Sequence, residues 1–288
     1  MSKYVLLTDS ACDLPQKVAD RHHIDIVCFK IALDGEGYTE RVDFAPEDFA
    51  QMLREAKGLP TTSQVTRYEF LERFEAYAEA GVEEVLYVSI NAAGSGTNAA
   101  AHAAAQDFHE EHPDSRMQIY IVDGRGYSLA YGGELVNAAL MLEEGSPMQE
   151  VVSYLNDKYA RMVTVITTYS LKVVRKSGRV NAAAAIAGDL LGIRPIFTLI
   201  DGESKVVKKL RGDKAVVSAM IKFVKEGMVA GTPYYLGYTN EKYVEEYAAL
   251  AEREIGYAPE MIIPLGSAVC ANIGPDAVGL VFEGPKRG

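Results

Sequence analysis

The sequence has few of the features that mark several common classes of protein. Its three cysteines, Cys12, Cys28 and Cys270, form no CxxC pair, so the sequence suggests neither a zinc site nor a redox pair. No apolar run approaches the roughly 18 residues that a membrane span requires. The first apolar run, residues 4–8, meets Asp9 at once and is typical of a first strand instead of a signal peptide. We therefore expect a cytoplasmic protein without an integral membrane segment.

Basic charge is also scarce. The chain holds 29 Lys and Arg against 40 Asp and Glu, a formal net charge of −11. An acidic chain without broad basic clusters is a poor partner for nucleic acid or for an anionic membrane surface. The five histidines show neither metal-ligand spacing nor a Ser–His–Asp arrangement with other side chains. The sequence therefore predicts no metal, no cofactor and no catalytic residue.

Short β-rich runs alternate with helical patterns along the chain. This alternation predicts an α/β fold whose N-terminal part is a mainly parallel sheet flanked by helices. We expect strands at residues 4–8, 25–31, 84–90, 118–122, 163–168, 194–200, 234–238, 260–264 and 278–282. We expect helices at residues 46–57, 67–79, 97–110, 128–143, 148–161, 181–190, 213–226 and 241–254.

The character of the chain changes after about residue 160. Residues 196–207 alternate in polarity around the pair Asp201-Gly202, which is typical of a hairpin turn. This pattern predicts antiparallel pairing and hence a C-terminal α/β domain with a mixed sheet. With 288 residues and 48% hydrophobic residues the chain can form two medium domains, which we place at 1–158 and 159–288.

The turn Gly94-Ser95-Gly96-Thr97 joins a predicted strand to the Ala-rich helix that follows it. Because the first N–H groups of a helix lack partners and the helix dipole is positive there, such a turn favours an anion. Glycine allows close approach, and Ser95 and Thr97 add two hydroxyl donors. The turn lacks the lysine of a P-loop and the GxGxxG spacing of a dinucleotide fold. A tight turn with a Ser/Thr cap is the alternative.

Other polar segments allow two interpretations each. Thr61-Thr62-Ser63-Gln64 precedes a helix and is either a set of hydroxyl donors to an oxyanion or an ordinary N-cap. Asp9 ends the first strand and is either a phosphohydrolase acid or a capping residue. Ser128 follows a strand at the same predicted sheet edge and has the position of a cap. Arg179 is either a solvated helix-end cation or a partner for a carboxylate.

One basic run, residues 208–214, lies in the otherwise acidic sequence. Such a run is usually a solvated face, but it could also dock an acidic partner or a phosphate group.

Taken in order, these segments resemble the DegV family, the fatty-acid-binding proteins that include the FakB subunits of bacterial fatty acid kinase. The resemblance covers nearly the whole chain and rests on Thr8-Asp9-Ser10 with Asp13-Leu14, Thr61-Thr62-Ser63-Gln64, Ser95-Gly96-Thr97, Val122-Asp123 with Ser128, Ser177-Gly178-Arg179, Arg194-Pro195-Ile196 with Asp201-Gly202, and Lys209-Leu210-Arg211 with Lys214-Ala215.

The resemblance implies two α/β domains with an acyl chain buried between them. It places Thr62, Ser63, Ser95 and Thr97 around the carboxylate, with Gly96 in the same turn. Arg179 matches a family arginine near the head group. Arg211 matches an arginine associated with docking of the kinase.

The sequence departs from the family pattern at two places. Asn91 and Ala92 stand where the family often has two serines after the strand. Asn272 stands where many members carry a histidine that reaches the carboxylate. Asparagine donates a neutral hydrogen bond and supplies no charge, so Asn272 keeps open a lipid sensor or storage protein that acts without a kinase.

Together these observations predict a non-enzymatic carrier of a long-chain fatty acid, with no cofactor, that presents the carboxylate to a fatty acid kinase for acyl-phosphate formation. The alternatives are a kinase-independent lipid sensor and a phosphohydrolase or phosphotransferase. The last would use Asp9 and the Gly94-Ser95-Gly96-Thr97 turn to hold phosphate.

Overall fold

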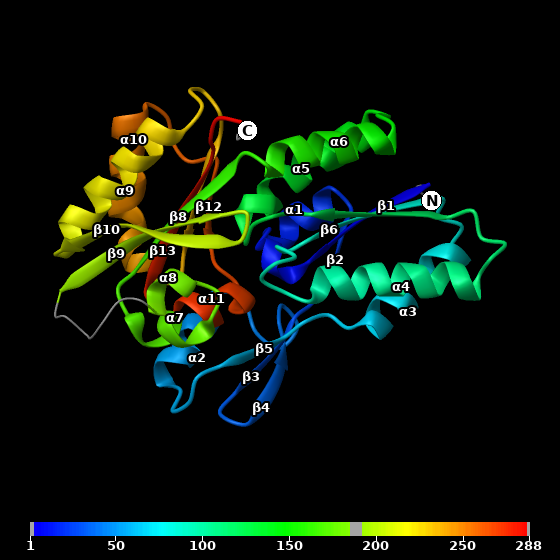
Figure 1. The fold of residues 1–288 in the computed structure, drawn as a ribbon, viewed down its shortest axis with the longest axis horizontal. Helices are drawn as coiled ribbons and strands as arrows, with labels where there is room; N and C mark the ends of the chain where they lie inside the picture. The colour runs from blue at the N-terminus through cyan, green and yellow to red at the C-terminus, as the bar shows by residue number, and fades with distance from the viewer. Residues whose placement is uncertain (1–2, 185–191, 287–288) are drawn as a thin grey trace.

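The computed structural model describes residues 3–184 and 192–286, which form three sheets with helices around them (Figure 1). The first sheet is parallel, with strand order β2-β1-β6-β7. Its strands are β1 (Tyr4–Asp9), β2 (Ile24–Val27), β6 (Glu84–Ser89) and β7 (Gln118–Asp123).

Helices cover both faces of this parallel sheet. On one face Leu7, Val85 and Tyr87 pack against α3 (Arg67–Glu79) and α4 (Thr97–Glu111). On the other face the alternate residues Leu6, Leu86 and Val88 pack against α1 (Gln16–Arg21), α5 (Leu129–Glu143) and α6 (Met148–Tyr159). The sheet is therefore buried on both sides, which explains the nearly continuous apolar runs of its strands.

The second sheet is mixed, with strand order β10-β9-β8-β13-β11-β12. All its neighbours pair antiparallel except β11 and β12. Its strands are β8 (Met162–Thr168), β9 (Ile193–Ile200), β10 (Glu203–Arg211), β11 (Tyr234–Tyr238), β12 (Met261–Pro264) and β13 (Ala277–Glu283). One face packs against α9 (Asp213–Gly227), η2 (Glu241–Tyr243) and α10 (Val244–Ile255), and the other packs against α7 (Leu171–Ser177), α8 (Asn181–Ala184) and α11 (Ser267–Ile273).

A third, antiparallel sheet corrects one prediction. Its strands are β3 (Lys30–Leu33), β4 (Glu36–Thr39) and β5 (Thr61–Ser63), and α2 (Asp48–Glu55) packs beside them. The single strand expected at 25–31 is therefore two strands of different sheets, because β2 pairs with β1 whereas β3 pairs with β4 and β5. The apolar residues run on through residues 28–29, so the pattern hides the change of partner.

The expected fold class is confirmed, and most helices and strands of the two larger sheets lie close to the ranges that the pattern predicts. Asp201 and Gly202 have φ of 50° and 79°, as a type I′ hairpin turn requires. Among the described residues, the elements that the pattern missed are short: η1 (Ser10–Cys12), α1, β4, β5, α7 and α11 each have seven residues or fewer. Of the helix expected at 181–190, only α8 falls within the described residues.

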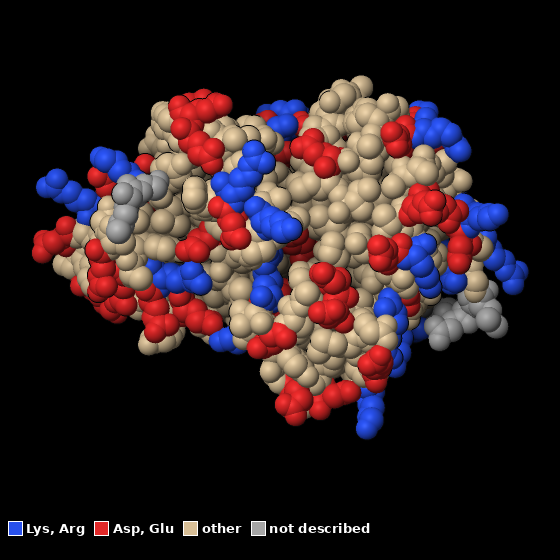
Figure 2. All heavy atoms as spheres, turned by 180° about the vertical axis from the view of Figure 1, so that it is seen from behind, with Lys and Arg blue, Asp and Glu red and all other residues tan. Residues whose placement is uncertain are grey.

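The two larger sheets share one apolar core, which joins α5 and α6 to Met162, Tyr235 and Val281. The division at residue 158 falls inside the last turn of α6, so it stays a prediction. Among the described residues no helix has the length and apolar character needed to cross a bilayer. The face seen in Figure 2 carries acidic and basic side chains side by side, without a broad basic field.

Candidate ligand-binding site

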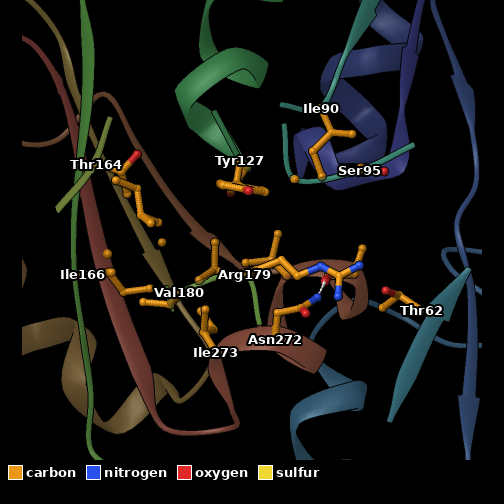
Figure 3. Close-up of a pocket in the computed structure, with 18 of the residues that line it drawn as sticks. Thr62, Ile90, Ser95, Tyr127, Thr164, Ile166, Arg179, Val180, Asn272 and Ile273 are labelled. Carbon is orange, nitrogen blue, oxygen red and sulfur yellow. Dashed lines mark hydrogen bonds between the residues drawn. The ribbon is translucent and has the colours of Figure 1, made fainter. Parts of the chain in front are cut away.

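A recess lies between the loops that follow β6 and β7, strand β5, and the inner face of the six-stranded sheet (Figure 3). The volume open to the centres of water molecules is about 150 Å³, and the whole space including the open mouth is about 1060 Å³. The recess has a polar part and an apolar part. Figure 3 shows Thr62 and Ser95 at one side and Thr164 and Ile166 at the other.

Four of the predicted polar site residues come together at the polar part. Thr62, Ser95, Arg179 and Asn272 all line the recess, as does Gly96. Thr62 lies on β5, Ser95 and Gly96 lie in the turn before α4, Arg179 follows α7, and Asn272 lies on α11. The fold therefore brings them together from positions far apart in the sequence. In Figure 3 the guanidinium of Arg179 extends toward Thr62, with Asn272 beside it. An arginine and several hydroxyls around one space are typical of a carboxylate or phosphate site.

The remaining walls are mainly apolar, although Ser128 and Thr164 also line them. Their apolar residues are Phe29, Ile90, Leu129, Ile166, Val180, Leu199, Leu265, Ala268, Val269, Ile273 and Val281. Apolar walls with a few convergent polar groups are the usual design of a small-molecule site.

Thr97 lies behind Ser95 instead of lining the recess. Its side chain is fully buried, and its Oγ1 lies 2.9 Å from Ser95 Oγ. The N–H of Thr97 also donates to Ser95 Oγ over 3.3 Å. If the Thr97 hydroxyl donates as well, the Ser95 hydroxyl keeps its own proton for a ligand. The structure therefore gives Thr97 a supporting position.

The glycines of this turn serve a purpose that the sequence did not show. A Cβ at Gly94 would lie 1.9 Å from Tyr127 Oη, and one at Gly96 would lie 2.0 Å from Gln64 Oε1. The glycines thus make room for two protein side chains, both of which line the recess. Sequence reasoning missed Tyr127 and Gln64 as lining residues. The one signal in the sequence is the glycine opposite each of them, and a glycine does not show which side chain packs against it.

The backbone of the turn is also less available to an anion than expected. The N–H groups of Gly94 and Ser95 donate to the carbonyl oxygen of Asn91, and Gly94 N–H also reaches Asn91 Oδ1 at 2.9 Å. Because the N–H of Thr97 is bonded to Ser95 Oγ as well, three of the four N–H groups of residues 94–97 already have acceptors, and the turn depends on its hydroxyls more than expected.

Arg179 and Asn272 have partners within the chain but keep further capacity. Arg179 Nη1 donates to the carbonyl oxygen of Ser177 at 3.0 Å, which uses one of its five N–H groups. Asn272 Nδ2 donates to the carbonyl oxygen of Ala268 at 2.7 Å. Burial raises the pKa of Tyr127, and the charge of Arg179, which lines the same recess, opposes that rise.

Two predicted residues lie elsewhere. Ser63 follows Thr62 on β5, and successive side chains on a strand point to opposite faces; Ser63 is exposed and is not among the lining residues. The interpretation of residues 61–64 as a helix cap is wrong, because Thr66 forms the capping box of α3 with Glu69. Arg211 is exposed at the end of β10, outside the recess.

Asp9 is a structural residue in this fold. It is fully buried, and it accepts hydrogen bonds from Ile90 N at 2.8 Å, Tyr87 Oη at 2.9 Å and Tyr131 Oη at 2.6 Å. Burial raises the pKa of Asp9 to about 6, against the effect of these donors. Asp9 does not cap η1 through its side chain. Its oxygens face the core, where they fix the tyrosines and the end of β6.

A buried pair of acidic residues, Asp13 and Glu40, positions α11, the helix that carries Asn272. Glu40 Oε1 accepts from Ser267 Oγ at 2.8 Å and from Ala268 N at 2.9 Å. Asp13 Oδ1 accepts from Gly266 N at 3.0 Å, and burial together with the charge of Glu40 raises the pKa of Asp13 well above its usual range. The pair holds the start of the helix beside the recess.

Ser128 departs from its expected role as a cap. It precedes α5, but its side chain makes no capping hydrogen bond, and its φ of 55° with ψ of −136° is unusual for a non-glycine residue. The residue is buried and lines the recess. Strained backbone of this kind occurs mainly where surrounding structure requires it, and here the N–H of Ser128 donates to the carbonyl oxygen of Ala11.

Comparison with known proteins gives the family. The sequence profile of the DegV family, described as a family of uncharacterised proteins, matches residues 3–284. The chain is a member of the DegV family. It is 30% identical over 286 residues to a DegV domain-containing protein of Caldanaerobacter subterraneus, covering 98% of this chain and 99% of that one.

Solved structures share the fold over nearly the whole chain. A fatty-acid-binding DegV family protein from Thermus thermophilus has a TM-score of 0.83 and 26% identity, covering 98% of this chain and 100% of that one. A DegV lipid-binding protein from Thermotoga maritima has a TM-score of 0.83 and 26% identity, covering 100% of both chains. A stearic-acid-binding protein from Eubacterium ventriosum has a TM-score of 0.87 and 24% identity, covering 98% of both, which shows the shared fold.

Proposed function

We propose that this protein binds a long-chain fatty acid non-covalently in the recess, with the carboxylate among Thr62, Ser95, Arg179 and Asn272. The observation that carries the proposal is the division of the recess into a hydroxyl-and-guanidinium part and an apolar part. The relatives described as fatty-acid- or lipid-binding, from Thermus thermophilus and Thermotoga maritima, support it.

The energetics favour such a ligand. Burying one CH₂ group contributes about 0.8 kcal/mol, so some 15 methylenes contribute roughly 12 kcal/mol before the costs of ordering. The carboxylate needs partners at the same time, because an unpaired buried charge is prohibitive. Ser95, with Thr97 behind it, and Thr62 supply hydroxyl donors, and Arg179 supplies a cation that can pair with both carboxylate oxygens.

The test is direct identification of the ligand. The purified protein is extracted with organic solvent, the extract is examined by mass spectrometry, and the delipidated protein is titrated with long-chain fatty acids. We expect a fatty acid in the extract or saturable binding in the titration. Absence of both would overturn the proposal. Ser153→Ala, at an exposed position on α6, serves as the matched control for serine changes in the recess.

We further propose that the bound carboxylate is presented to a fatty acid kinase, with Arg211 on the docking surface. Arg211 is exposed and stands beside Lys208, Lys209 and Lys214, where the chain passes from the edge strand β10 to α9. A basic group of this kind suits an acidic partner surface.

The docking role is tested by capture of a bacterial fatty acid kinase catalytic subunit. Arg211→Ala should weaken capture, whereas Arg253→Ala, which changes another exposed arginine, on α10, should not. Unchanged capture by Arg211→Ala would remove this residue from the docking surface. Saturable fatty acid binding without any capture of a kinase would instead favour the kinase-independent sensor.

The phosphohydrolase alternative has less support. Asp9, its required acid, is buried and accepts three hydrogen bonds from core donors. A nucleophile or general acid must reach the reacting group, and the recess is not lined by Asp9.

A further inference from the structure

The apolar part of the recess has a glycine on its floor. Gly279 of β13 pairs with Ile166 of β8 on one side and with Gly237 of β11 on the other. Paired residues of neighbouring strands point to the same face of a sheet, so Gly279 faces the recess beside Ile166. Figure 3 shows Ile166 and Thr164 on the side of the recess away from Thr62.

The two paired glycines differ in what lies above them. A Cβ at Gly237 would lie 2.5 Å from Leu265 Cδ2, so the side chain of Leu265 already fills that space. A Cβ at Gly279 would meet nothing closer than Val165 O at 3.8 Å and Ile166 Cγ1 at 4.0 Å. These are ordinary van der Waals distances, so the floor above Gly279 is open.

The usual reasons for a glycine do not apply to Gly279. Its φ is not positive, so an L side chain fits the backbone. No neighbour comes close enough to forbid a Cβ. A glycine inside a strand weakens the strand and often marks a place where a ligand approaches closely. The remaining consequence of the missing side chain is additional depth in the recess.

We propose that Gly279 sets the length of the acyl chain that the recess accepts, by leaving room for the methyl end of the chain. This inference rests on the proposed fatty acid binding at the same site. Val281 and Leu199 flank this floor, since both are paired in register with Thr164. A side chain at position 279 would occupy the volume into which the end of a long chain extends.

The experiment measures dissociation constants for a series of saturated fatty acids of increasing length. For Gly279→Val we expect unchanged affinity for short acids and a loss for long acids of roughly fourfold for each methylene that no longer fits. Val281→Ala, which enlarges the same wall, should shift the preference toward longer acids. Gly37→Ala, where a Cβ would meet nothing within 4 Å on the β3–β4 hairpin, is the matched control and should change nothing.

Several outcomes distinguish the proposal from its alternatives. Ser95→Ala should lower affinity by the same factor at every chain length, because it acts on the carboxylate. If Gly279→Val behaves like Ser95→Ala, or leaves the length preference unchanged, the proposal is overturned. If the wild-type protein binds no fatty acid of any length, the proposed function fails instead. Thermal unfolding of each variant shows whether it folds. If Gly279→Val does not fold, Gly279→Ala and Val281→Ala provide the test, because the first should shift the preference toward shorter acids and the second toward longer acids.

Discussion

The neighbouring parallel strands β1 and β6 each end in a polar cluster, and the two clusters have opposite characters. At the end of β1, Asp9 is fully buried, and its oxygens accept from three core donors. After β6, Ser95 is partly exposed, lines the recess and is supported from behind by Thr97. Ligands of α/β sheets bind at this edge, so position alone predicts a ligand site at both clusters. The clusters differ in how deeply they are buried and in whether their polar atoms already have hydrogen-bond partners.

The difference shows what makes a polar residue available for function. A carboxylate whose oxygens are all bonded inside the core contributes to the native structure, whereas a hydroxyl with an unused donor at a cavity wall can act on a ligand. The Asp9 cluster should therefore govern stability and leave binding alone. The Ser95 cluster should do the reverse.

The largest expected effect is the loss of the Asp9 carboxylate. Asp9→Ala leaves Ile90 N–H and the hydroxyls of Tyr87 and Tyr131 without their buried acceptor, and each such group costs about 1–3 kcal/mol. We expect the free energy of unfolding to fall by about 3–5 kcal/mol in urea denaturation. Fatty acid affinity of the folded fraction should be retained. A stable Asp9→Ala variant with lost binding would reverse the assignment of the two clusters.

The second prediction concerns the pH dependence of stability. Because the pKa of Asp9 is raised to about 6 in the folded protein and lies near 4 in the unfolded chain, the folded state holds this proton more tightly. The contribution is fully present below pH 4 and is lost as pH rises through 6, a change of about 3 kcal/mol. Asp13, whose pKa is also raised, acts in the same direction.

Urea denaturation of the wild type and Asp9→Asn at several pH values between 4 and 7 checks this. The difference in unfolding free energy between the two proteins should decrease as pH rises. A difference that stays constant across the range would show that Asp9 does not titrate there.

The third prediction concerns the Ser95 cluster. Ser95→Ala should lower fatty acid affinity by about 1–3 kcal/mol, the range for one hydrogen bond to a charged group, while the free energy of unfolding changes little. Thr97→Val should produce a smaller loss of affinity, because it removes only the hydroxyl behind Ser95. Isothermal titration with a long-chain fatty acid measures both. Equal affinity for wild type and Ser95→Ala would remove Ser95 from the carboxylate site.

The contrast also explains how much the sequence could reveal. The strand and helix pattern predicts the fold class and places Thr62, Ser95 and Arg179 among the candidates, and the family resemblance adds Asn272; these four residues do line one recess. Pattern alone cannot show that β5 turns Ser63 away from the recess, or that Thr97 lies beneath Ser95. Those facts depend on the register of a three-residue strand and on packing between segments far apart in the chain.

The role of a glycine is equally hard to predict from the sequence alone. The sequence shows a glycine at positions 94, 96, 237 and 279 alike, and each could be interpreted as room for a ligand. In the structure, Tyr127, Gln64 and Leu265 fill the space at the first three, whereas the space at Gly279 stays open. The identity of the neighbour, which is a tertiary contact, decides the role of each glycine.

The smallest expected effect concerns Arg179, which lines the same recess as Ser95 but is itself exposed. Solvent and salt screen an exposed ion pair, so such pairs contribute about 0–1 kcal/mol. Arg179→Gln should therefore lower fatty acid affinity by at most about 1 kcal/mol at low salt. The loss should become smaller as salt is added, whereas the loss caused by Ser95→Ala should change little. Titrations of both variants at low and high ionic strength make the comparison. A large, salt-independent loss for Arg179→Gln would mean that the bound carboxylate draws the guanidinium out of solvent, and the site would then rely on this charge more than on its hydroxyls.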